Sequence, residues 1–513
     1  MVLGKGWRAR FWIKPAVATT LTAAADLLFY GPGAGSTLGA FGLALALATL
    51  VTQPQIRRDR RAVLAWLVAA AAALAMIDQP TVIGFCFCYI GLAIAVLSSR
   101  TVAQAGAWRW CRRLMVQFGT GLIGPALDLM ALHGLRRRKR WLPRHRLLSI
   151  LALPLLGGGL FVALFAAANP LIGDVFARLT LPEIDIYRGL FWLMVATGVW
   201  MFLRPRFMRS KPAVVRGHAA IDLPGVSPLS VGLSLALFNL LFAIENGLDI
   251  AFLWSRAALP HGVTLASYAH RGAYTLIVTA LLAGLFVLVT LQPGSTTAQR
   301  PWLRRLVVAW VAQNLVLVAS SVLRTVDYIQ FFSLTRLRIA ALVWMVLVAI
   351  GLALICWRLL RGKSAAWLVN ANILAAGLAL AGCSVADLGA VAANWNLDHA
   401  QEVSGGGDSL DLWYLRRLGP DALAPLSRLA LRPTPSVYHD QIAWLRWRAL
   451  EDLRHQQGSW RTWTGRGQHQ LDQAIDILPA SSPAAYFRPG ERTTSGYLKP
   501  AWAPPPATPA KTG

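Results

Sequence analysis

Apolar residues in this chain are grouped into long uninterrupted stretches along its first three quarters. A membrane-spanning helix needs about 20 mostly apolar residues, with about 17–25 tolerated. Such stretches are expected to be helices, because a lipid-exposed strand edge would leave backbone polar groups without hydrogen-bond partners. Eleven stretches qualify: 12–31, 36–52, 62–78, 81–98, 148–168, 189–204, 231–254, 273–292, 303–322, 338–358 and 366–388. The pattern predicts an all-α fold, a polytopic transmembrane helix bundle of about 11 spans within residues 1–394.

Two segments of the bundle allow more than one interpretation. Residues 115–133 contain Pro125 and Asp128, which favours an interfacial or re-entrant position over a full span. The stretch 12–31 has small residues typical of a signal-cleavage site, but Lys14 interrupts it and another span follows closely. We expect this first stretch to remain as an uncleaved helix.

The chain after residue 394 has the composition of a water-exposed region. Short helices are expected at 409–418, 421–430 and 436–455. The last of these carries its apolar residues along one face, namely Ile442, Leu445, Ala449 and Leu453. We therefore predict a helical extracytoplasmic region at 395–478 and a disordered tail rich in Pro and Ala at 479–513.

The composition agrees with a membrane location. Hydrophobic residues make up 56% of the chain and charged residues only 14%, whereas a soluble globular domain averages about 45–50% and about 25%. A soluble enzyme of this length is therefore excluded.

The excess of positive charge predicts how the bundle is oriented. Lys and Arg number 50 against 23 Asp and Glu, a formal net charge of +27. With the N-terminus in the cytoplasm, thirty basic residues fall on inner segments, seven in short outer loops and thirteen in the tail. Cytoplasmic loops carry the excess of Lys and Arg. We therefore expect an N-in/C-out topology in a bacterial inner membrane, with a basic cytoplasmic loop at 99–147 and an extracytoplasmic tail.

The basic run at 136–140 has the composition of a nucleic-acid-binding patch. No nucleic-acid-binding fold signature accompanies it in the sequence, and juxtamembrane basic clusters bind the anionic surface of a bilayer. We expect the lipid bilayer, and no nucleic acid, as its partner.

Ionisable residues inside spans are costly and are candidates for function. Glu245 and Asp249 are four residues apart, so they share one helix face near the outer end of their span. At a similar depth lie further charged residues: Arg271, Arg324, Asp327, Arg336 and Arg338. Two interpretations stay open: salt bridges between helices, or an outward-facing polar cavity in which arginines hold an anionic ligand or lipid.

No sequence motif predicts a particular reaction. Walker, His-Glu-x-x-His and Gly-x-Ser-x-Gly patterns are absent from the sequence, and its 5 cysteines have no Cys-x-x-Cys spacing. We therefore assign no catalytic residue, metal or cofactor.

Several short motifs of this chain are shared with a known family. They are Tyr268-Ala-His-Arg271-Gly272-Ala-Tyr274, Arg324-x3-Tyr328, Ser333-Leu-Thr-Arg-Leu-Arg338, Ala25-Asp26-x-Leu-Phe29-Tyr30, Asn394-Trp-Asn396 and Asp411-Leu-Trp-Tyr414-Leu. Up to about residue 430, the chain resembles polytopic bacterial inner-membrane proteins of unknown function, the domain-of-unknown-function groups four-one-five-three and four-one-seven-three. Ser333 stands where that family usually has Gly. The resemblance implies fold and location but no activity, and it places Arg271, Arg324, Tyr328, Thr335 and Arg338 at motif positions.

Three functions are compatible with these observations. The leading hypothesis is a non-enzymatic transport, lipid-binding, anion-binding or sensing component with an outward-facing polar cavity. The second is a membrane-bound enzyme that acts on lipid-linked substrates and needs a carboxylate among Asp26, Glu245, Asp249 and Asp327. The third is a structural or signalling protein whose C-terminal tail docks onto another envelope protein.

Overall fold

The computed structural model describes the chain in helical segments. The described residues are 5–31, 33–99, 106–137, 185–205, 227–255, 282, 286, 300–405, 409–432, 436–493 and 496–498. Within these ranges all regular structure is helical, apart from one isolated antiparallel bridge between Arg492 and Leu498. The predicted all-α class is confirmed for this part of the chain.

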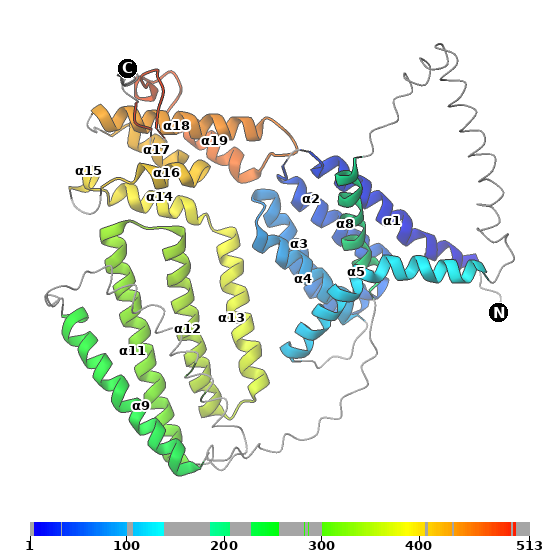
Figure 1. Ribbon diagram of the computed structural model, residues 1–513, viewed down its shortest axis with the longest axis horizontal. Coiled ribbons are helices and arrows are strands. Elements are labelled where there is room, and N and C mark those ends of the chain that lie inside the picture. Colours follow the sequence, from blue (N-terminus) through cyan, green and yellow to red (C-terminus); the bar gives the residue numbers. More distant parts are fainter. Residues whose placement is uncertain are drawn as a thin grey trace, which may run out of the picture.

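The first helices form what we call the N-terminal helix group, drawn in blue, cyan and dark green in Figure 1. Its members are α1 (Lys5–Phe29), α2 (Thr37–Thr52), α3 (Arg60–Asp78), α4 (Val82–Ser98), α5 (Ala107–Arg137) and α8 (Ile186–Leu203). Short side-chain caps set where several of them begin: Asp59 accepts a hydrogen bond from the Arg61 amide, and Thr81 accepts one from the Gly84 amide.

Small residues let α2, α3 and α4 approach closely. A Cβ at Gly39 would collide with the backbone of α3, and one at Gly91 would crowd Ala69. Lipid does not drive helices together hydrophobically, so close backbone packing between small residues supplies much of their attraction. The Ala- and Gly-rich composition of these helices therefore matches their packing.

The segment expected to be interfacial or re-entrant lies within α5. Helix α5 is continuous and contains Pro125, and its later part projects sideways from the group in Figure 1. Asp128 is buried, accepts a hydrogen bond of 2.9 Å from the Trp200 indole and pairs with Arg204 at 3.2 Å. These contacts neutralise the carboxylate against the end of α8.

The second helix group comprises α9 (Pro228–Asp249), α11 (Pro301–Phe332), α12 (Arg336–Arg361) and α13 (Ala365–Val385). The last helix of the four begins where Ser364 caps the Trp367 amide, and α9 continues as one π-helical turn, Ile250–Trp254. The buried core of the second helix group is formed by Leu235, Leu303, Val307, Leu352 and Leu368.

Most of the predicted spans correspond to described helices. Six are long and apolar enough to cross a membrane, namely α3, α8, α9 with its π turn, α11, α12 and α13. Two more, α2 and α4, are apolar but shorter. Of the predicted spans, 148–168 and most of 273–292 lie outside the described residues.

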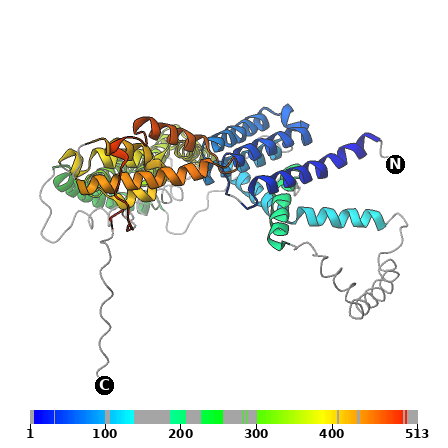
Figure 2. The same ribbon diagram turned by 90° about the horizontal axis from the view of Figure 1, so that it is seen from above.

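The remaining helices form the tail layer, which lies across one end of the second helix group and reaches the N-terminal group (Figures 1 and 2). Its helices are α14 (Leu388–Asp398), α15 (Gln401–Ser404), α16 (Leu412–Leu418), η3 (Gly419–Ala422), α17 (Leu423–Ala430), α18 (Ser436–Gln457), α19 (Gly465–Ile477) and η4 (Pro483–Ala485).

The tail layer has a hydrophobic core of its own. The predicted face of α18 is confirmed: Ile442, Leu445 and Leu453 are buried and Ala449 is partly buried. Beside them lies the buried Arg446 guanidinium, which donates to Ser427 Oγ at 2.8 Å. It also donates to the backbone carbonyls of Ala474, in α19, and Leu478, directly after α19.

Part of the stretch after residue 479 contacts α18. The Arg492 guanidinium donates to Asp440 of α18 at 2.9 Å, and the Arg488 amide donates to the same carboxylate at 2.7 Å. The Arg492 guanidinium also lies near the rings of Trp444 and Phe487. The expectation that this tail is disordered stays a prediction. Residues from 499 onward lie outside the described part.

The ends of helices from both groups meet the tail layer. Before α2, the Gly35 and Ser36 amides donate to Arg461 O and Trp463 O at 2.9 and 2.7 Å. Between α11 and α12, Asn396 exchanges two hydrogen bonds with the Leu334 backbone. Away from the tail layer, the two groups touch where the Ala107 amide donates to Asn370 of α13 at 3.0 Å.

Candidate functional site

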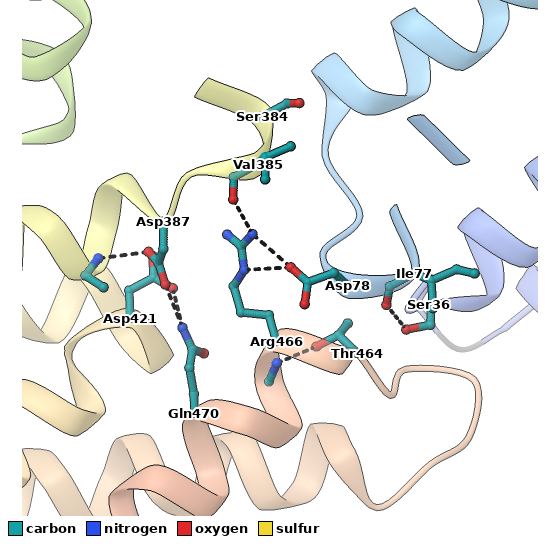
Figure 3. Close-up of polar contacts among 12 residues, drawn as sticks. Ser36, Ile77, Asp78, Ser384, Val385, Asp387, Asp421, Thr464, Arg466 and Gln470 are labelled. Atoms are coloured by element: carbon teal, nitrogen blue, oxygen red, sulfur yellow. Dashed lines mark hydrogen bonds and ion pairs between the residues drawn. The ribbon is translucent and has the colours of Figure 1, made fainter. Parts of the chain in front are cut away.

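A polar cavity lies where the two helix groups and the tail layer meet, and we call it the junction cavity. Its volume is about 390 Å³. It is lined by Asp78, Val385, Asp387, Ala390, Asn394, Pro420, Asp421, Ala424, Pro425, Arg428, Arg466, His469, Gln470 and Gln473. Figure 3 shows its central contacts.

Arg466 joins both helix groups to the tail layer. Thr464 caps the start of α19 through the Gly467 amide, and this places the arginine in the first turn. Its guanidinium donates to Asp78, the last residue of α3, at 2.9 and 3.1 Å, and to Val385 O, at the end of α13, at 2.6 Å (Figure 3). One side chain therefore contacts the ends of two spans from different groups.

Two carboxylates of the cavity share one amide donor. Gln470, one turn after Arg466, donates to Asp387 at 3.0 Å and to Asp421 at 3.2 Å (Figure 3). Asp387 also caps α14, because its other oxygen accepts from the Ala390 amide at 2.8 Å. The neutral amide lets the two carboxylates lie close together without cancelling either charge.

The two carboxylates are balanced differently. Asp421 forms an ion pair with Arg336 from the start of α12. The two residues leave no room for a side chain at Gly389, since a Cβ there would collide with both. Burial, and next the neighbouring Asp387 carboxylate, raise the pKa of Asp421 above its ordinary value, although Arg336 and Gln470 act to lower it.

The exposed rim of the cavity has the opposite character. Arg428 and His469 are exposed, as is Gln473, whereas Gln470 is buried and both carboxylates are half-buried. Within the described part of the chain, the Arg428 guanidinium has no carboxylate within ion-pair distance. The cavity thus has an acidic inner wall and a basic rim.

Residues predicted from the sequence fall into two places outside this cavity. Asp249 of α9 and Arg324 of α11 form a buried ion pair inside the second helix group, with 2% and 9% of their side chains exposed. Glu245 lies exposed one turn before Asp249, and Asp327 is half-buried one turn after Arg324. Asp26, in the N-terminal helix group, pairs with Arg188.

The second place is the turn between α11 and α12. Arg338 donates to Phe332 O and Ser333 O, and its guanidinium lies 4.5 Å from the centre of the Tyr328 ring. Arg336 forms an ion pair with the cavity-lining Asp421. Arg271 lies outside the described residues.

The motif around this turn has a clear structural role. Ser333 has φ of +66°, the only positive value among described residues other than glycine. Leu334 is buried, and Thr335 caps α12 through the Arg338 amide. A glycine at this position would adopt the same backbone without a Cβ penalty. The motif therefore encodes a tight turn.

The cavity residues themselves were not predicted. Asp387 lies directly before α14, and Asp421 lies in the short helix η3. In a sequence, aspartates at such positions are interpreted as ordinary helix caps and turn residues. Arg466 and Gln470 lie in a polar segment with a near-neutral balance of charge. Only the packing of α19 against α3, α17 and η3 brings these residues together. Among the described residues, no group of three His, Cys, Asp or Glu side chains is arranged to hold a metal ion.

Comparison with known proteins gives one match. The family model of a domain of unknown function, DUF4153, matches residues 62–429. No curated protein and no solved structure matches the chain. The match covers Asp78, Asp387, Asp421 and Arg428, whereas Arg466 and Gln470 lie beyond it. By this match over more than half of its length, the chain belongs to the DUF4153 family, as a helical protein with several membrane-spanning helices.

Proposed function

We propose that this protein is a multi-pass inner-membrane component that binds a small polar solute, bearing both a positive and a negative group, in the junction cavity. The observation that supports it best is the cavity itself, with its acidic inner wall and basic rim. Its volume of about 390 Å³ falls within the range of about 300–1,000 Å³ typical of small-molecule sites.

The charges in the cavity suit a zwitterion bound in one orientation. Asp421 has Arg336 as its counter-ion, whereas Asp387 is stabilised by the Gln470 amide and the start of α14. A cationic group would complete the balance at the inner wall. At the rim the guanidinium of Arg428 would bind the anionic end, because charge-assisted hydrogen bonds are the strongest available there.

Binding in this place would affect both helix groups. Arg466 lines the cavity and contacts the ends of α3 and α13. A solute that competes for Asp78 or displaces Gln470 would change how the tail layer holds the two groups. This coupling favours sensing or transport over a purely structural role.

The proposal includes the N-in/C-out topology. The helix ends that contact the tail layer are those that the distribution of basic residues assigns to the outer side, including the ends of α3 and α13 and the starts of α2 and α12. The junction cavity would then open to the extracytoplasmic side.

Binding can be tested with three probes and the full-length protein in nanodiscs. The probes are phosphoethanolamine, which carries both charges, and ethanolamine and inorganic phosphate, which carry one each. Thermal unfolding and calorimetric titration would be measured for the wild type, Arg428→Gln and Arg432→Gln. Arg432 is the matched control, since it is an exposed arginine of the same layer that pairs with Asp398 and does not line the cavity.

We expect phosphoethanolamine to bind more tightly than either single-charge probe. Arg428→Gln should weaken that binding by about tenfold, which is the loss of one charge-assisted hydrogen bond of about 1.4 kcal/mol. Arg432→Gln should bind as the wild type does. Equal affinities for all three probes, or unchanged binding by Arg428→Gln, would refute the proposal.

A further inference from the structure

Arg358 is a buried arginine in the last turn of α12, at the end of the helix away from the tail layer. Its side chain is 3% exposed. Its Nε and Nη1 atoms are buried and have no hydrogen-bond partner among the described residues. It lies three residues after Ile355, so it shares the helix face that packs against Leu303 of α11 and Leu368 of α13.

Among the described residues, no carboxylate pairs with this arginine. The acidic residues of α9, α11, α12 and α13 are Glu245, Asp249 and Asp327. All three lie in the halves of α9 and α11 that approach the tail layer. Since α11 and α12 are joined by a tight turn and run antiparallel, Arg358 lies towards the opposite end of the group from these carboxylates.

Other cations gather at the same end of the second helix group. Arg300, Arg304 and Arg305 stand at the start of α11, which lies beside the end of α12. Arg361 and Lys363 follow Arg358 within two turns. The negative end of the α12 dipole favours a cation here, but it supplies no acceptor to Nε or Nη1. Among the described residues, the site is therefore rich in positive charge, and none of them supplies an acceptor to Nε or Nη1 of Arg358.

The depth of Arg358 corresponds to a membrane surface. It follows Arg336 by 22 residues, which is about 33 Å along an α-helix and close to the hydrocarbon thickness of about 30 Å. Arg336 contacts the tail layer, so Arg358 lies near the lipid headgroups of the opposite leaflet. Large apolar side chains beside it, Trp302, Trp357 and Leu360, are exposed.

We propose that Arg358 and the cations around it bind the phosphate of an anionic phospholipid in the leaflet opposite the tail layer. A phosphate accepts two parallel hydrogen bonds from one guanidinium, which would satisfy the donors that have no partner. Basic sites between helices at this depth suit phospholipid headgroups. The exposed tryptophans and Leu360 would contact the glycerol backbone and acyl chains, which a soluble phosphate lacks. This site is independent of the junction cavity.

The test uses full-length protein purified in a maltoside detergent, which contains no phosphate. Phosphatidylglycerol would be titrated while bound lipid is counted by native mass spectrometry and unfolding is followed by heating. Glycerol phosphate would be added as the soluble competitor. Arg358→Gln is the main variant, and Arg448→Gln, which changes an exposed arginine of the tail layer, is the control.

We expect the wild type to retain phosphatidylglycerol and to unfold at a higher temperature with it. Arg358→Gln should lose affinity for the lipid on the order of tenfold, Arg448→Gln should bind the lipid as the wild type does, and glycerol phosphate should not displace the lipid. Lipid binding by Arg358→Gln equal to that of the wild type would overturn the proposal. Displacement by glycerol phosphate alone would also overturn it, in favour of a soluble phosphate ligand.

A second variant covers the case in which Arg358→Gln does not fold. Arg358→Met keeps the long side chain and removes the buried charge, so in lipid-free detergent it should be at least as stable as the wild type. Adding phosphatidylglycerol should then stabilise the wild type more than this variant. An equal gain for both proteins would contradict the proposed site.

Discussion

At the scale of single residues, the ion pair between Asp249 and Arg324 lies buried inside the second helix group. Both side chains are almost fully removed from solvent. Truncating one partner of such a pair leaves an uncompensated charge, which costs about 3–5 kcal/mol, whereas replacing both by apolar residues is often neutral. Comparing single and double substitutions therefore distinguishes a structural salt bridge from a binding role for these two residues.

We expect Asp249→Ala to destabilise the protein by about 3–5 kcal/mol and the double change Asp249→Leu with Arg324→Met to restore most of this loss. Chemical denaturation in detergent measures both. Glu245→Gln is the control on the same helix, and it should have little effect because that side chain is exposed. A double variant as unstable as the single one would contradict the structural interpretation.

Ser333 offers a second test, because it adopts a backbone conformation that favours glycine. A glycine at this position removes a backbone strain of about 1–3 kcal/mol from the folded protein. The greater conformational freedom of glycine in the unfolded chain offsets part of this gain. We expect Ser333→Gly to raise stability by about 1 kcal/mol. Ser384→Gly, inside α13, should lower it by about 0.5 kcal/mol. A destabilised Ser333→Gly would mean that the turn is not strained.

The raised pKa of Asp421 predicts how stability depends on pH. A carboxyl whose pKa is higher in the folded protein than in the unfolded chain binds its proton more tightly when folded. Stability contributed by this group is therefore gained as pH falls from its raised pKa towards its ordinary value, and it is lost again as pH rises.

We expect the unfolding temperature of the wild type, relative to Asp421→Asn, to increase between about pH 7 and about pH 4. Thermal scans at a series of pH values give this difference. The opposite slope would show that the ion pair with Arg336 dominates the energy of the carboxylate.

At the scale of elements, α19 is the helix that connects the tail layer with both helix groups. Its first turn holds Arg466 and its second turn holds Gln470, so successive turns contact the spans and the neighbouring helices of the layer. The helix is short and has few apolar residues, which is why its hydrophobic pattern does not reveal it in the sequence. Its position comes from polar contacts at its start and from Ala474 and Leu478 in the core.

We expect Arg466→Gln to loosen the contact between the two groups more than it lowers overall stability, because the ion pair with Asp78 is half exposed and such pairs contribute about 0.2–1 kcal/mol. Spin labels at Leu74 of α3 and Leu378 of α13, both exposed, would report the distance between groups. The distance distribution should broaden.

Arg448→Gln is the matched control for this experiment. Its arginine forms an exposed pair with Asp452 within α18 at 3.5 Å and contacts neither helix group. Its distance distribution should equal that of the wild type. An unchanged distribution in Arg466→Gln would show that α19 does not hold the groups together.

At the scale of the whole molecule, the proposed topology predicts which surfaces reagents can reach. A single cysteine would be placed at Trp413 in the tail layer or at Arg361 at the opposite side, in a chain whose native cysteines are replaced. In intact cells, a membrane-impermeant maleimide should label the first and not the second, because only the tail layer lies outside. Labelling of position 361 alone would reverse the orientation.

Much of this architecture is determined by the sequence itself. Long apolar stretches can be satisfied in lipid only as helices, so the spans and the all-α class follow from local composition. The apolar face of α18 likewise follows from helical periodicity. The contact of Arg492 with Asp440 of α18 shows the limit, because the two residues lie far apart in the sequence.

Only the tertiary structure decided which polar residues meet. Charge in the sequence directed attention to the arginines near the outer ends of the spans, but Arg338 caps its own turn and Arg324 is paired within the bundle. Asp78, Asp387, Asp421 and Arg466 come from segments far apart in the chain and carry no local pattern. Periodicity reports which face of one helix is apolar, whereas a cavity between helices depends on long-range packing, which no local window of sequence contains.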